Sequence, residues 1–274
     1  MKPPTPAIAR AFGVTGSVEI QPLPGGQGQA WHCGGLVFKP VGCPAETAWV
    51  CGVYDGWPPS AGVRVPQPER SQDGSWVYDG WAAHHWVEGR DVSMPSEIET
   101  VRVACEAFSD VVAGLERPSF LDLRSDPWSY GDRVAWEGAE PQGSEPTQRL
   151  LAEALAALQP VHSQAQVIHG DIGGNVLVAD GLRPAVIDWP PYFRPRGLAL
   201  AVVAVDALSW SGAPAELLDA WSDVPDWEQL LLRAVIFRVA TEGRRECLGT
   251  APAGGSRHVE QHRTALSAVL GRLR

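Results

Sequence analysis

The chain has 274 residues, 45% of them hydrophobic and 20% charged, which is enough to bury the core of one large domain or of two lobes. Its formal net charge of −10 argues against nucleic acid and anionic membranes as partners. No apolar run is long enough to span a bilayer, and the five cysteines form no C-x-x-C pair. We therefore predict reduced thiols, no zinc knuckle and a cytoplasmic location.

The first part of the chain has the pattern of strands around one helix. Gly25, Gly26 and Gly28 lie in a turn between the first two expected strands, where glycines let backbone N–H groups approach phosphate oxygens closely. A helix is expected to begin at Pro44, with Glu46 in its first turn. The expected strands are Val18–Leu23, Ala30–Cys33, Leu36–Lys39, Val63–Val65, Ser75–Tyr78 and Trp81–Val87.

After residue 86 the pattern becomes helical, apart from residues 118–146, which are expected to be loop-rich. Asp206 interrupts an apolar helix, so its carboxylate is either buried with hydrogen-bond partners or lines a cleft, and we favour the first. The expected helices are Glu97–Leu115, Thr147–Val161, Gly197–Trp210, Pro214–Trp221, Asp226–Thr241 and His258–Leu273.

Two short apolar runs, Val176–Val178 and Ala185–Ile187, flank a segment rich in turn formers and predict a β-hairpin. Asn175 precedes the first strand and Asp188 follows the second, so the hairpin predicts that they lie at the same end. Asp171 lies in the loop that leads into the hairpin. Two carboxylates and one amide oxygen suit a hard, oxygen-preferring cation beside a reacting hydroxyl.

Composition marks two of the residues that this interpretation uses. Among 22 basic residues, lysine occurs only at Lys2 and Lys39, and asparagine occurs only at Asn175. A lysine ammonium is a compact point charge that fits a phosphate site differently from a guanidinium. In a chain that otherwise uses arginine, Lys39 at the end of an apolar strand is therefore a candidate phosphate ligand, although a solvated strand end is the alternative.

The triplet His169-Gly170-Asp171, followed by Asn175 and then by Ile187-Asp188-Trp189, resembles the catalytic and metal-binding loops of the aminoglycoside phosphotransferase-like small-molecule kinases. That family shares the two-lobed fold of protein kinases. The resemblance implies an α+β fold, with a small antiparallel β-sheet N-lobe over residues 1–86 and a helix-rich C-lobe over residues 87–274.

The resemblance also implies roles for individual residues. Asp171 would be the catalytic base, and Asn175 and Asp188 would hold Mg²⁺. The glycine-rich turn and Lys39 would contact the phosphates of ATP. Glu46 would pair with Lys39, although it can equally favour its helix N-terminus through the dipole. Backbone groups near Trp86 and Val87 would meet the adenine. Asn175 follows Asp171 by four residues, where the family usually has five.

The short segment between Asp188 and the next expected helix leaves no room for a peptide-binding activation segment. This predicts a small hydroxyl acceptor, such as an amino sugar, a sugar or an amino alcohol, with the γ-phosphate of ATP as donor. One alternative is a kinase-like module that binds nucleotide without transferring phosphate. A metallohydrolase built on His169 and Asp171 ranks lower, because no further ligands stand at a suitable spacing.

Overall fold

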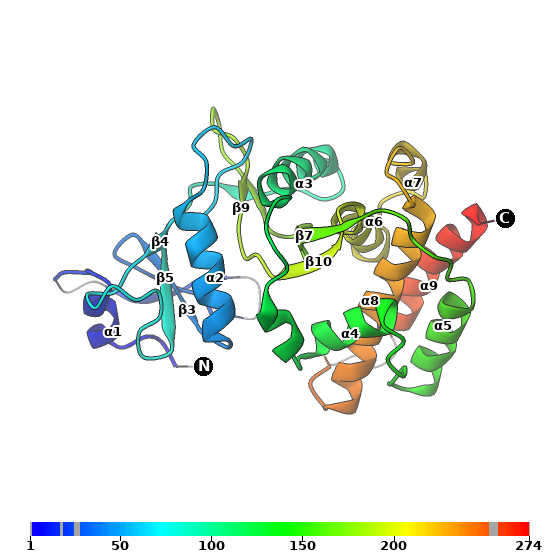
Figure 1. The fold of residues 1–274 in the computed structure, drawn as a ribbon, viewed down its shortest axis with the longest axis horizontal. Coiled ribbons are helices and arrows are strands. Elements are labelled where there is room, and N and C mark those ends of the chain that lie inside the picture. The colour runs from blue at the N-terminus through cyan, green and yellow to red at the C-terminus, as the bar shows by residue number, and fades with distance from the viewer. Residues whose placement is uncertain (1, 17–18, 25–27, 252–256, 274) are drawn as a thin grey trace. The chain divides into compact units, whose positions relative to one another are not determined.

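The computed structural model describes residues 2–16, 19–24, 28–251 and 257–273. The chain forms two compact units (Figure 1). The first contains Met1–Asp91 and Val176–Asp188, and the second contains Val92–Asn175 and Trp189–Arg274. The α+β class expected from the sequence is confirmed, whereas the lobe boundary at residue 86 stays a prediction.

The first unit is built on an antiparallel sheet in the order β1-β2-β3-β5-β4. A separate antiparallel sheet, in the order β6-β8-β9, carries the predicted hairpin. The helices are α1 (Pro6–Ala11) and α2 (Pro44–Asp55). The strands are β1 (Gln21–Pro22), β2 (Trp31–Cys33), β3 (Leu36–Pro40), β4 (Pro68–Glu69), β5 (Trp81–His85), β6 (Arg90–Asp91), β8 (Val176–Val178) and β9 (Ala185–Val186).

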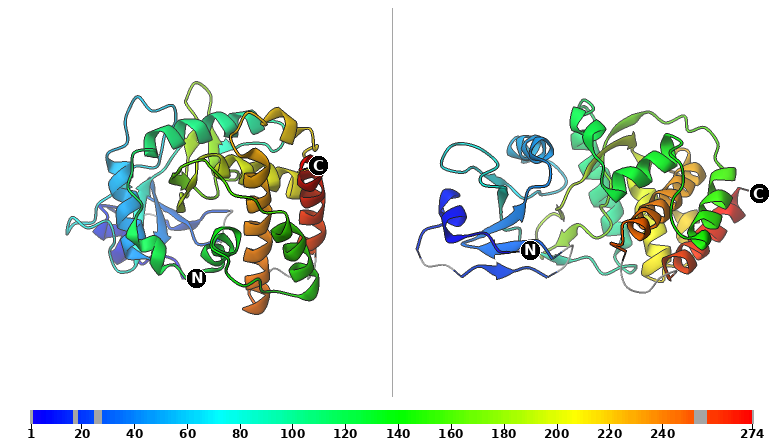
Figure 2. Two further views of the ribbon diagram at one scale, coloured as in Figure 1. Left: turned by 45° about the vertical axis from the view of Figure 1, so that its right-hand side comes forward. Right: turned by 90° about the horizontal axis from the view of Figure 1, so that it is seen from below.

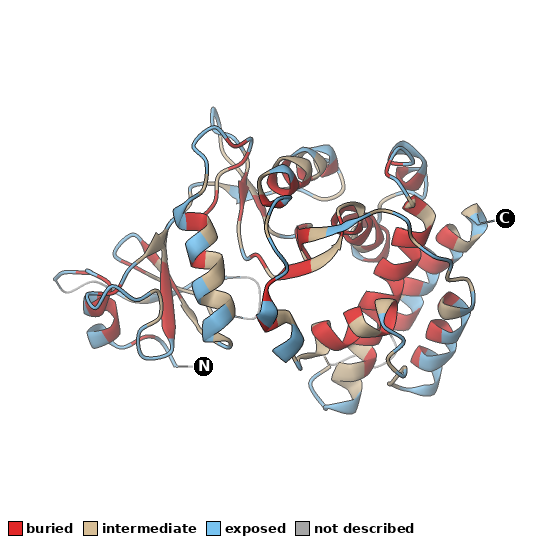
Figure 3. Cartoon of the chain, in the orientation of Figure 1, coloured by how far each residue is buried: buried red, intermediate tan, exposed pale blue. Residues whose placement is uncertain are grey.

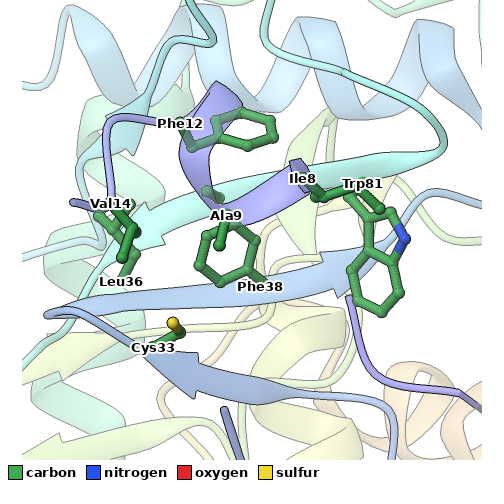
Figure 4. Close-up of a cluster of buried hydrophobic side chains, with 9 residues drawn as sticks. Ile8, Ala9, Phe12, Val14, Cys33, Leu36, Phe38 and Trp81 are labelled. Atoms are coloured by element: carbon green, nitrogen blue, oxygen red, sulfur yellow. The ribbon is translucent and has the colours of Figure 1, made fainter. Parts of the chain in front are cut away.

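Helix α1 covers one face of the five-stranded sheet (Figure 4). Thr5 accepts a hydrogen bond from the backbone N–H of Ile8 and caps the helix start. Phe12 then packs edge-on against Phe38 of β3, with ring centroids 5.7 Å apart. Their burial fixes the register of β3, so Lys39, the next residue along, lies on the opposite face of the strand from Phe38.

The hairpin is confirmed, since Val176 pairs with Val186 and Leu177 pairs with Ala185 in antiparallel register. Arg64 joins it to the rest of the first unit, because its side chain donates to the carbonyl of Arg183 at 2.8 Å and to that of Glu88 at 3.0 Å. The strand expected at Val63–Val65 is wrong, since this segment forms only an isolated bridge between Arg64 and Ala185.

Another expected strand, Ser75–Tyr78, is also wrong. Asp73 accepts hydrogen bonds from Ser71 Oγ and from the backbone N–H of Ser75, and these bonds hold the segment in a turn. Strand β5 pairs on one side with β3 and on the other with β4, which lies between these two expected strands.

The second unit is mainly helical and contains one two-stranded antiparallel sheet, β7 (Ala165–His169) with β10 (Pro191–Pro195). Its helices are α3 (Ile98–Val112), the 3₁₀ helix η1 (Ser119–Leu123), α4 (Pro127–Trp136), α5 (Glu145–Ala156), α6 (Gly197–Trp210), α7 (Leu217–Ala220), α8 (Trp227–Cys247) and α9 (Arg257–Arg272). No helix in the described part of the chain has the length and apolar character needed to cross a membrane.

Helix α8 forms the centre of the second unit. It is buried along most of its length (Figure 3), and α9 lies beside it (Figure 2). Helix α4 packs closely on α8 at Gly131, where a Cβ would lie 2.4 Å from Thr241 Oγ1 and 2.5 Å from the carbonyl oxygen of Phe237. The stretch expected to be loop-rich, residues 118–146, therefore contains a helix that the sequence pattern did not predict. Asp126, which caps α4, and Pro127, at its first turn, are the local signal for this helix.

His262 of α9 is fully buried beside Trp210, and burial lowers its pKa to about 4. Between about pH 6.5 and pH 4 the unfolded chain binds a proton here that the folded chain does not, so folding stability falls as the pH falls. We expect His262→Leu to weaken this acid destabilisation by about 2–3 kcal/mol. Chemical unfolding of both proteins at pH 7 and pH 4.5 measures the difference, and equal losses of stability would contradict the assignment.

Candidate active site

The loop after β7 is held by contacts within the second unit. His169 is buried, its Nδ1 accepts a hydrogen bond from the backbone N–H of Asp171 at 3.1 Å, and its ring packs edge-on against Phe108. Trp189 also packs edge-on against Phe108 and donates from Nε1 to the carbonyl of Ile168 at 3.0 Å. His169 and Trp189 therefore fix the backbone on which Asp171 is carried.

Gly170 is required by the close approach of Tyr192 on β10. A Cβ at this position would lie 2.2 Å from Tyr192 Cδ2 and 2.4 Å from Cε2, far inside van der Waals contact. The ring of Tyr192 is itself buried against Phe237, so it has little room to move.

We expect Gly170→Ala to destabilise the protein by about 1–3 kcal/mol and to displace Asp171, because the added methyl must push either Tyr192 or the loop backbone aside. Gly174→Ala is the matched control in the same loop, since a Cβ at Gly174 meets nothing within 4 Å. Thermal unfolding of the two variants should separate them. Equal melting temperatures would show that the contact with Tyr192 does not constrain the loop.

Asp171 lies in the wall of a hollow of about 210 Å³ within the second unit. Its side chain is 47% exposed, and Arg238 Nη2 donates to its Oδ1 at 2.5 Å. The wall carries charges of both signs, with Arg245 paired to Glu242 at 2.8 Å. The other lining residues are Trp128, Trp210 and Thr241. A half-exposed carboxylate beside a hollow is placed to accept a proton from a bound hydroxyl.

Asn175 folds back onto the same loop. Its Nδ2 donates to the backbone carbonyl of Asp171 at 2.6 Å, and its backbone N–H donates to the carbonyl of Ile172 at 3.0 Å. The four-residue spacing thus closes a compact turn in which the amide nitrogen is used internally. The amide oxygen is then the group that a hard cation can use.

Lys39 and Asp188 form an ion pair within the first unit. Asp188 has a φ of 49°, a left-handed conformation that few residues other than glycine adopt. Such backbone strain concentrates at functional sites. An aspartate carboxylate is a ligand that Mg²⁺ prefers, and a lysine ammonium suits a phosphate, so the chemistry of these two residues fits a metal–nucleotide complex.

The Lys39 side chain is partly buried, with 36% of its surface exposed. Burial lowers its pKa to about 8. Its charge in turn adds to burial in lowering the pKa of His84 to about 4. A partly buried ammonium interacts more strongly with an anionic partner than a fully hydrated one does.

Fewer contacts define the remaining residues that were predicted to bind the nucleotide. Gly28 has a φ of +65°, which suits a glycine turn, while Gly25 and Gly26 lie outside the described residues. Glu46 stands in the first turn of α2, and its pairing with Lys39 stays a prediction. Trp86 follows β5, donates from its backbone N–H to the carbonyl of Gly35 and is 49% exposed; Val87 is half-buried. Their contact with adenine also stays a prediction.

Sequence reasoning missed Arg238, which binds Asp171. The sequence feature that could have identified it is a single arginine within the apolar run Ala234–Ala240. A buried guanidinium needs carboxylate partners, so such an arginine indicates a buried ion pair. Asp206, the lone carboxylate in the apolar helix α6, is one of them, and the expectation that it is buried with hydrogen-bond partners is confirmed.

Comparison with known proteins supports the resemblance seen in the motifs. Residues 58–192 match the model of the phosphotransferase enzyme family. No match was found among the curated proteins.

Three solved structures of similar fold cover almost the whole chain. The choline kinase LicA from Streptococcus pneumoniae has a TM-score of 0.65 at 11% identity, covering 97% of this chain and 98% of its own. A thermostable mutant of the aminoglycoside phosphotransferase APH(4)-Ia, in a ternary complex with ADP and hygromycin B, has a TM-score of 0.63 at 16% identity, covering 96% and 97%. A choline/ethanolamine kinase family protein from Mesorhizobium loti has a TM-score of 0.58 at 18% identity, covering 98% and 95%.

These comparisons confirm the protein-kinase-like fold and the resemblance to the aminoglycoside phosphotransferase-like kinases. At 11–18% identity, the three solved structures are evidence for the fold alone.

Proposed function

We infer that this chain, which resembles the phosphotransferase enzyme family over residues 58–192, is an ATP-dependent kinase that transfers the γ-phosphate to a hydroxyl of a small molecule. The observation that carries the proposal is Asp171, a half-exposed carboxylate held by Arg238 in the wall of a hollow. Phosphoryl transfer requires mainly positioning and charge neutralisation, which this arrangement can supply.

Asp171 accepts the proton of the attacking hydroxyl in this proposal. The acceptor oxygen forms a bond to the γ-phosphorus, the bond from that phosphorus to the β–γ bridging oxygen breaks, and ADP leaves. Lys39 would hold the α- and β-phosphates, and Asn175 and Asp188 would hold Mg²⁺. When bound, the metal ion neutralises charge on the phosphate oxygens. The glycine-rich turn and the backbone near Trp86 and Val87 complete the proposed nucleotide site.

The acceptor is a neutral or weakly charged member of the predicted classes, namely a sugar, an amino sugar or an amino alcohol. Glu242 in the wall of the hollow is already paired with Arg245, whereas Arg238 is shared between Asp171 and Asp206, so one net negative charge remains beside the hollow. This balance of charges favours one ammonium group or none over a polycation. Trp210, which is 50% exposed, offers an apolar face to a ring or a methyl group. A cytoplasmic location stays a prediction.

ADP release from Mg·ATP, measured against a panel of sugars, amino sugars and amino alcohols, tests the proposal. We expect release that depends on the acceptor and that Asp171→Ala abolishes. A protein whose melting temperature rises with Mg·ATP, yet which releases ADP with no acceptor in the panel, would instead be a nucleotide-binding module.

A further inference from the structure

Arg238 is the most deeply buried charged side chain next to the candidate base. It lies in the middle of α8, and 7% of its side chain is exposed. A guanidinium in such a place is costly unless carboxylates pair with it. Burial alone would lower the pKa of Arg238, but Asp206 and Asp171 outweigh burial and leave that pKa above its ordinary value. Arg238 is therefore charged at any working pH.

Asp206 holds Arg238 through a two-point contact. Arg238 Nε donates to Asp206 Oδ1 at 2.9 Å, and Nη2 donates to Oδ2 at 2.5 Å. Asp206 is mostly buried, with 15% of its side chain exposed. A planar guanidinium bound in this way has a fixed orientation, because rotation about its last bonds would break one hydrogen bond or the other.

The same guanidinium reaches Asp171 with a single bond. Nη2 donates to Asp171 Oδ1 at 2.5 Å, whereas Oδ2 has no hydrogen-bond partner among the described residues. The two carboxylates therefore differ in role. Asp206 fixes the orientation of the arginine, and the arginine in turn holds one oxygen of Asp171 in place. The three side chains together carry one net negative charge, so the arginine does not cancel the charge of Asp171.

We propose that Arg238, fixed by Asp206, is a positioning residue that holds the Asp171 carboxylate by Oδ1 and leaves Oδ2 to accept the proton of the acceptor hydroxyl. The inference rests on the proposed function for its chemical consequence. Its structural part, that Arg238 sets the orientation of Asp171, stands independently of turnover.

The test compares variants of the full-length protein. Arg238→Lys keeps one positive charge but cannot bind two carboxylates through a planar fork. We expect it to lower kcat by about tenfold to a hundredfold, with the KM for ATP changed less than about twofold, because small displacements of a catalytic group act on turnover. Asp206→Leu combined with Arg238→Met removes both buried charges at once, so the protein keeps its fold, while kcat falls at least as far as in Arg238→Lys.

Arg194→Lys is the matched control. Arg194 makes a similar two-point contact with Asp132, at 3.0 and 2.5 Å, in the same unit but without touching Asp171. We expect this variant to lose thermal stability and to keep the wild-type kcat. An equal loss of kcat in Arg194→Lys would mean that any broken ion pair has the same effect, and would overturn the proposal.

Crystal structures of the wild type and of Arg238→Lys give a readout that needs no turnover. We expect one ordered Asp171 carboxylate in the wild type, and a rotated or disordered one in the variant. An unchanged carboxylate, or an unchanged kcat in an active enzyme, would refute the positioning role alone. A wild-type protein that transfers no phosphate while its Asp171 behaves as expected in the crystals would refute the proposed function alone.

Discussion

We expect Asp171→Asn to lower acceptor-dependent ADP release by about 100-fold to 10,000-fold, the usual contribution of a positioned general base. The amide has nearly the shape of the carboxylate but cannot take up a proton. The backbone N–H of Asp171 keeps its bond to His169, and its carbonyl keeps its bond to Asn175, so the loop is preserved. Steady-state kinetics with the best acceptor of the panel measure the loss.

The stability of Asp171→Asn in Mg·ATP separates catalysis from binding. Because the side chain of Asp171 is proposed to touch the acceptor and not the nucleotide, we expect Mg·ATP to raise the melting temperature of the variant as much as that of the wild type. A variant with wild-type turnover would exclude Asp171 as the base. A variant that no longer responds to Mg·ATP would place Asp171 in the nucleotide site instead.

Asp188→Asn should remove both turnover and the stabilisation by Mg·ATP. Its carboxylate is the proposed metal ligand and is also the ion-pair partner of Lys39, so the neutral amide weakens the site for the cation. At a nucleotide concentration about a hundred times Kd, binding stabilises the wild type by about 2.7 kcal/mol, and we expect most of this to disappear. Thermal unfolding with and without Mg·ATP measures it.

Asp180→Asn is the control for Asp188→Asn, because Asp180 lies in the turn of the same hairpin, outside β8 and β9. It should keep the full response to Mg·ATP. If Asp188→Asn binds Mg·ATP as tightly as this control does, Asp188 is not a metal ligand and the strained backbone there needs another explanation.

The fold followed from the sequence wherever local patterns and tertiary contacts agree. The hairpin at Val176–Val186 has apolar strands around a turn-forming segment, and both signals favour the same pairing. Helix α4 was missed because its sequence, with three aromatic residues and a glycine, has weak helix propensity. Its packing on α8 through Gly131 stabilises the helix where its own propensity is weak. A short segment of sequence does not reveal a contact of this kind, because the partner helix lies far along the chain.

The candidate site was predictable in its motif residues and less so in their partners. His169 ends β7, and Asp171 and Asn175 follow in the next loop, so spacing alone predicts their proximity. Arg238 comes from a helix 67 residues further along the chain. The free-energy cost of burying a lone arginine indicates that a carboxylate must pair with it, but the chain contains several candidate carboxylates. Which one it meets is decided by helix packing, which a sequence pattern does not specify.

The most direct test of the central claim follows the phosphate itself. The protein is incubated with ATP carrying a radiolabelled γ-phosphate, with Mg²⁺ and with each acceptor of the panel, and the products are separated. We predict that label moves to a hydroxyl of at least one sugar, amino sugar or amino alcohol in the wild type, and that this transfer is at least about 100-fold slower in Asp171→Asn. Label that remains on ATP with every acceptor, or that moves equally well in Asp171→Asn, would contradict the claim.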